Sequence, residues 1–84
     1  MRSPPLYPAI EMLRRLGDVP SGDPIRVAAI CEARGRDCLR EAQWHAHIGH
    51  DATADTYYRA YKSDMEQARK TLAAALLNAP EVAA

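Results

Sequence analysis

The residues best suited to chemistry are concentrated in residues 31–50, which hold both cysteines and all three histidines of the chain. Cysteine and histidine together are the usual ligands of zinc. Cys31, Cys38 and His45 are spaced by seven residues, and seven helical residues rise about 10.5 Å. Zinc–ligand bonds are only about 2.0–2.3 Å long, and a disulfide needs Cα atoms closer than about 7 Å. We therefore expect these three residues, on one continuous helix, to share no metal and to form no disulfide.

A second group of possible metal ligands lies at the predicted helix end near Gly49. His47, His50 and Asp51 could be folded together by the turn that follows the helix. Protonated histidines also interact favourably with a helix C-terminus, and this role needs no ligand. We keep these three residues as the metal candidates and otherwise assign no cofactor to the chain.

The elements that position these residues are predicted to be three helices. Asp23 and Pro24 are typical of a helix start, and Gly17 and Gly49 of helix ends. These signals predict a short first helix, a second over residues 24–48 and a third over residues 52–77, where apolar residues recur at helical spacing. Nothing alternates with period two, so no strand is expected. The predicted fold is all-α, with a short first helix and a long antiparallel hairpin as one domain over residues 1–78, followed by a flexible tail over residues 79–84.

Two faces of the second helix are predicted to meet neighbours. One face is a stripe of small residues that lets another helix approach closely, because free cysteine behaves as a small hydrophobe. The other face is apolar, and either the first helix or another chain could cover it. The predicted interface residues are Cys31, Gly35, Cys38 and Ala42 on the small stripe and Ile30, Trp44 and Ile48 on the apolar face.

Composition favours self-association of this chain. Alanine supplies 16 residues, whereas Leu, Ile and Val together number 14 and phenylalanine is absent. Because alanine adds little burial energy, the core of one chain of 84 residues is expected to be small. We therefore expect a homodimer that forms a larger helical bundle.

Charge and composition also limit the function classes. Eleven basic residues balance eleven acidic ones, so no overall field attracts nucleic acid or an anionic membrane. On the second helix, four arginines alternate with Glu32, Asp37 and Glu41, which predicts a mixed solvated face. The chain lacks a run of about 18 apolar residues and an apolar signal region. These features and the two cysteines predict a cytoplasmic location without membrane association.

No arrangement of residues points to catalysis. Tyr57, Tyr58 and Tyr61 cluster near the start of the third helix, where we expect them to close the end of the hairpin beside His45. The sequence therefore predicts a non-enzymatic protein–protein interaction module, accessory or regulatory, of a kind found in phages and plasmids. The alternatives are a nucleic-acid-binding regulator and a metal-binding protein that uses the His-rich turn.

Overall fold

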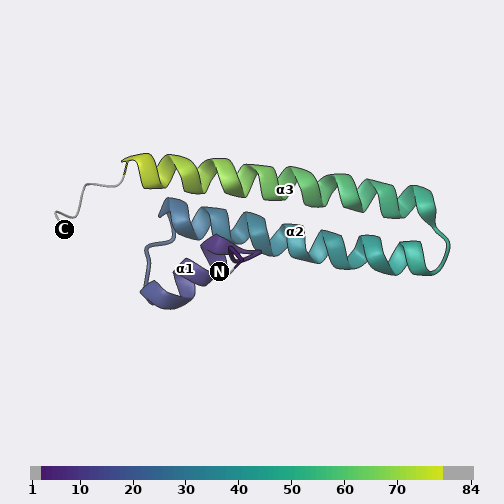
Figure 1. Cartoon of the computed structure of the whole chain (residues 1–84), viewed down its shortest axis with the longest axis horizontal. Coiled ribbons are helices and arrows are strands. Elements are labelled where there is room, and N and C mark those ends of the chain that lie inside the picture. The colour runs from purple at the N-terminus through teal and green to yellow at the C-terminus, as the bar shows by residue number, and fades with distance from the viewer. Residues whose placement is uncertain (1–2, 79–84) are drawn as a thin grey trace.

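The computed structural model describes residues 3–78, which form three helices. They are α1 (Pro8–Leu16), α2 (Pro24–His47) and α3 (Asp51–Asn78). Figure 1 shows α2 and α3 side by side as a long antiparallel hairpin, with α1 beside the N-terminal half of α2. The predicted all-α fold with a long hairpin is thus confirmed, and residues 3–78 contain no strand. The predicted tail, residues 79–84, lies outside the described residues.

The ends of the two long helices lie within one residue of their predicted positions. At the start of α2, the Asp23 carboxylate accepts a hydrogen bond of 2.8 Å from the backbone N–H of Ile25, which satisfies one of the free donors of the first turn. After α2 the chain reverses at Gly49, which has a φ of 83°. This left-handed conformation favours glycine because it has no Cβ.

The start of α1 is held from outside the helix. Tyr7 occupies the N-cap position without a side-chain hydrogen bond. Instead, the backbone N–H groups of Ala9 and Ile10 donate to the two carboxylate oxygens of Glu32 on α2, at 2.9 and 2.8 Å. Glu32 is only 1% exposed, so the prediction that it lies on a solvated face was wrong. A negative charge at this position also interacts favourably with the positive end of the α1 dipole.

The core is narrow and made mostly of small side chains. Its buried apolar residues are Ala9, Ala28, Ala29, Cys31, Ala42, Ala54, Ala68 and Leu72. Gly35 on α2 lies so close to α3 that a Cβ atom there would be 3.1 Å from the sulfur of Met65. Small residues thus let the two long helices approach closely, and the molecule is an elongated slab of 53 × 31 × 21 Å.

Candidate interaction surfaces

One face of α2 is exposed along its length, and Arg34 on this face forms an ion pair with Asp64 of α3. We call this face the outer strip, and it consists of Val27, Ile30, Arg34, Asp37, Glu41, Trp44 and Ile48. These residues follow one another at alternating intervals of three and four, which is the spacing of a helix face that contacts a second helix. All seven are exposed. The strip is apolar at both ends and charged in the middle.

The apolar residues of the outer strip are large and open to solvent. Trp44 is 57% exposed and Ile30 is 53% exposed, and Val27 and Ile48 are at 40% and 42%. The first helix does not cover Trp44, because α1 packs near the start of α2, where its residues contact the core around Ala28 and Ala29. Of the two neighbours proposed for this face, α1 is therefore ruled out at Trp44, and the face is exposed.

The stripe of small residues on α2 faces α3 of the same chain. Cys31, Gly35 and Ala42 are buried, and Cys38 is half-buried. The Cys38 sulfur lies 4.0 Å from a carboxylate oxygen of Asp64 on α3. Burial raises the pKa of the Cys38 thiol, and the negative charge of Asp64 raises it further. These four predicted interface residues thus serve the packing within the hairpin.

The cysteines and histidines are spread over the hairpin. Because α2 is unbroken from Pro24 to His47, the seven-residue spacing keeps Cys31, Cys38 and His45 apart. At the turn, the His47 ring lies 6.1 Å from the Trp44 ring, and the His50 ring stacks on His45 at 5.8 Å. Within residues 3–78, no three His, Cys, Asp or Glu side chains are placed to hold a metal ion, and this includes His47, His50 and Asp51.

Aromatic rings close the turn end of the hairpin. The rings of His45 and Tyr57 stack in nearly parallel planes, with centroids 5.4 Å apart. Tyr58 and Tyr61 contact each other edge to face at 5.8 Å, and the Lys62 ammonium lies 4.8 Å above the Tyr58 ring. The His45–Tyr57 stack joins α2 to α3, whereas Tyr58, Tyr61 and Lys62 contact one another within α3.

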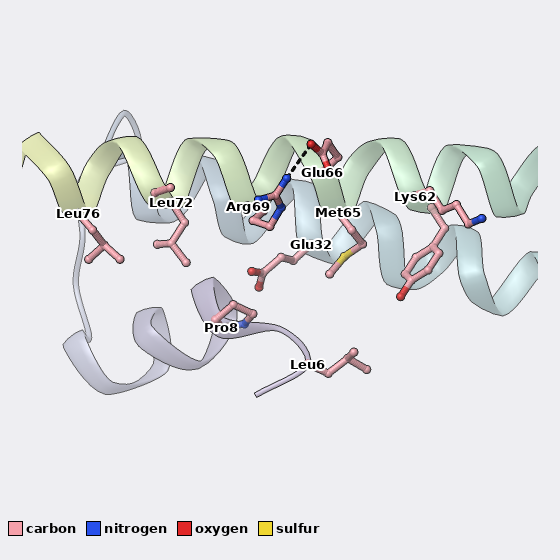
Figure 2. A pocket seen from close by; sticks show the side chains of 11 residues that line it. Leu6, Pro8, Glu32, Lys62, Met65, Glu66, Arg69, Leu72 and Leu76 are labelled. Carbon is pink, nitrogen blue, oxygen red and sulfur yellow. Dashed lines mark hydrogen bonds and ion pairs between the residues drawn. The ribbon is translucent and has the colours of Figure 1, made fainter. Parts of the chain in front are cut away.

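A groove of about 660 Å³ forms a second exposed apolar surface, between the segment before α1 and α3. Figure 2 shows Leu6 and Pro8 on one side and Met65, Leu72 and Leu76 on the other. Lys62, Glu66 and Arg69 also line it, and Arg69 and Glu66 form an ion pair of 2.8 Å. The groove is thus apolar with charges of both signs.

Glu32 lies between α1 and this groove (Figure 2), a role that was not predicted from the sequence. Two signals pointed to it. Glu32 follows Ala28 by four residues and precedes Gly35 by three, so it shares the face of α2 that carries the small stripe. In addition, α1 starts after Tyr7, which cannot cap a helix, so its first N–H groups need an acceptor from elsewhere.

Charges on the surface are largely paired within helices. Arg40 pairs with Asp37, Arg59 with Asp55, and Arg69 with Glu66, each three or four residues apart. Arg34 pairs with Asp64 at 3.5 Å and so links α2 to α3. Acids therefore accompany the arginines, and α2 presents no purely basic stripe. None of the helices within residues 3–78 has both the length and the apolar character needed to cross a membrane.

Comparison of the chain with protein families, with curated proteins and with solved structures finds no match. The outer strip and the groove are therefore interpreted from their own chemistry.

Proposed function

We propose that this protein is a non-enzymatic protein–protein interaction module, accessory or regulatory in role, whose docking surface is the outer strip of α2. The partner is a protein helix or helical surface, either from a second copy of the chain or from a different protein. The proposed site of action is the reducing cytoplasm, where Cys31 and Cys38 stay as the free thiols present in the structure.

This proposal is supported mainly by the exposure of large apolar side chains on one face of α2. The core is built mainly of alanine, whereas Trp44 and Ile30 are more than half exposed on one helix face. Tryptophan is enriched among the residues that dominate binding energy at interfaces. Exposed apolar side chains on one face of a monomer mark an interaction site more often than isolated ones do. Contact with a partner would bury these side chains, which the fold of one chain leaves exposed.

The spacing of the outer strip indicates the kind of partner. Alternating steps of three and four residues match the ridge that one helix presents to another. The charged centre of the strip, Arg34, Asp37 and Glu41, would then select partners with a matching charge order, because like charges placed opposite each other oppose binding.

The test is affinity capture from cells of the native host with three forms of the full chain. These are the unchanged chain, Ile30→Ser/Trp44→Ser on the outer strip, and Leu77→Ser as a control. Leu77 is 85% exposed near the end of α3, so the control removes apolar surface away from the strip. We expect a protein, or further copies of the chain, to be retained by the unchanged chain and the control and lost with the double variant.

Equal retention by all three forms would contradict the proposal. Circular dichroism of each variant checks that its helix content is unchanged. Since Ile30 and Trp44 are exposed, their replacement by serine is expected to leave the fold intact.

A further inference from the structure

We propose that the outer strip binds a second copy of this chain in antiparallel orientation, with α2 packed against α2 across a two-fold axis near Asp37. The inference rests on the proposed function, because both use the outer strip as the docking surface. It adds the identity of the partner and the direction in which the partner runs.

The apolar residues of the outer strip are arranged symmetrically about Asp37. Ile30 and Trp44 each lie seven residues from Asp37, on opposite sides. Val27 and Ile48 extend the two apolar ends by one further step of the strip. In an antiparallel pair centred at Asp37, Ile30 of one copy therefore meets Trp44 of the other, and the contact occurs twice. The same patch is used on both chains, as a two-fold interface requires.

The charged residues of the outer strip distinguish the antiparallel pair from the parallel one. In a parallel pair, Arg34, Asp37 and Glu41 would each lie opposite their own copy, which gives three like-charge contacts. In the antiparallel pair, Arg34 is level with position 40 of the second copy, between Asp37 and Glu41 and next to Arg40, so within the strip only Asp37 meets its own copy. Complementary charges across an interface fix its orientation, so the strip favours the antiparallel pair.

The charged residues in the middle of the outer strip can face those of a second copy in the antiparallel pair. The side chain of Arg34 is 63% exposed although it pairs with Asp64, and a guanidinium has five N–H donors. The two Asp37 carboxylates approach each other near the axis. Each is paired with Arg40 of its own chain at 3.5 Å, which reduces their repulsion.

All seven residues of the outer strip are exposed, although Arg34 also forms an ion pair with Asp64 of α3. α3 packs along α2 and α1 packs beside its N-terminal half, while Arg36, Arg40, Gln43 and Ala46 on a neighbouring side of α2 are exposed as well. A straight helix of 24 residues is about 36 Å long, which lets both apolar ends and the charged centre engage a second α2 at once.

Orientation is tested with a spin label at a single cysteine. The protein is the full chain with Cys31→Ala and Cys38→Ala, labelled at His47→Cys, which is exposed and lies beside the strip. His47 is ten residues from Asp37. The antiparallel pair therefore separates the two labels by about 30 Å along the axis, whereas a parallel pair holds them about 10–15 Å apart. Pulsed electron spin resonance measures the distance, and we expect the longer one.

Self-association is measured by sedimentation equilibrium for variants that remove an apolar side chain or exchange charges on the outer strip. Trp44→Ser is expected to weaken self-association by tenfold or more, and Leu77→Ser to leave it unchanged. Glu41→Arg is expected to weaken it because two arginines then face each other, and Arg34→Glu/Glu41→Arg to recover much of the loss. In a parallel pair the double variant would recover nothing, because like charges would still lie opposite each other.

The outcomes separate this inference from the proposed function. A chain that stays monomeric up to about 1 mM, yet captures another protein through Trp44, overturns the self-pairing and leaves the proposed function standing. A dimer that is insensitive to Trp44→Ser, such as one formed through the groove, overturns the self-pairing through the outer strip. A short label distance overturns the antiparallel orientation.

Discussion

At the scale of single residues, Glu32 is the polar group on which the position of α1 depends. Its carboxylate accepts hydrogen bonds from two backbone N–H groups of α1 while it is almost completely buried. Burial of a charged group is costly unless hydrogen bonds compensate it. Here the compensation comes from another helix, so one side chain couples the start of α1 to the middle of α2.

Replacement of Glu32 by alanine is expected to destabilise the protein by about 3 kcal/mol, because it leaves one buried and one partly buried N–H donor without an acceptor. Glu32→Gln retains one acceptor oxygen and should lose less. Urea unfolding followed by circular dichroism gives the free energy of unfolding. The matched control is Glu66→Ala, whose surface ion pairs contribute about 0–1 kcal/mol. A Glu32→Ala variant as stable as the unchanged chain would show that the carboxylate does not hold α1.

The Cys38 thiol provides a prediction about reactivity. Its pKa is raised, first by burial and then by the Asp64 carboxylate. A raised pKa leaves less thiolate at a given pH, and the thiolate is the reactive form. In a Cys31→Ala background at pH about 8, we expect Cys38 to react with a maleimide more slowly than free cysteine.

Asp64→Asn removes one of the negative charges, so the pKa of Cys38 should fall and its reaction should become faster. Asp55→Asn serves as the control, because Asp55 lies on the same helix but pairs with Arg59. If Asp64→Asn leaves the rate unchanged, the carboxylate does not act on the thiol.

At the scale of elements, the close approach of α2 and α3 is set by side-chain size. Gly35 leaves room for Met65, and a Cβ at this position would also lie 3.4 Å from the Cβ of Asp64. Glycine is a poor helix former, so its presence in the middle of α2 is explained by packing and not by helix propensity.

Gly35→Val is expected to lower the free energy of unfolding by about 1–3 kcal/mol, because the added methyl groups force α2 and α3 apart or displace Met65. Ala46→Val, at an exposed position of the same helix, should cost less than about 1 kcal/mol through helix propensity alone. Chemical unfolding of both variants checks this difference. Equal effects at the two positions would mean that the hairpin does not need a small residue at Gly35.

At the scale of the whole molecule, a thin slab buries little apolar surface. Its core contains six alanines with Cys31 and Leu72, and alanine contributes little burial energy. The larger apolar side chains of the outer strip lie outside this core. Stability of the chain is therefore expected to depend on what covers the strip.

The melting temperature should accordingly rise with chain concentration, because association of folded chains stabilises the folded state by mass action. Trp44→Ser is expected to remove this dependence, and Leu77→Ser to keep it. Thermal unfolding followed by circular dichroism over a wide range of concentration measures both. A melting temperature of the unchanged chain that does not vary with concentration would contradict coverage of the strip by a second copy.

The three helices could be predicted from the sequence, because helix starts, helix ends and apolar periodicity depend on neighbouring residues. Asp23 with Pro24 placed the start of α2, Gly49 placed the turn between α2 and α3, and Gly17 placed the end of α1. The seven-residue spacing of Cys31 and Cys38 also determined that these thiols lie apart on one helix, since the rise per residue is constant.

Only the tertiary structure decided which face of α2 is covered. Both the small stripe and the apolar face were suitable for packing, and their periodicity could not show whether α1, α3 or another chain meets each one. The structure places α3 on the stripe and α1 against Glu32, and leaves Trp44 exposed. Burial of a side chain depends on how all three helices pack together, and not on its neighbours in the sequence alone. Whether Glu32 is solvated or caps a helix depends on where α1, which begins 24 residues before it, comes to lie.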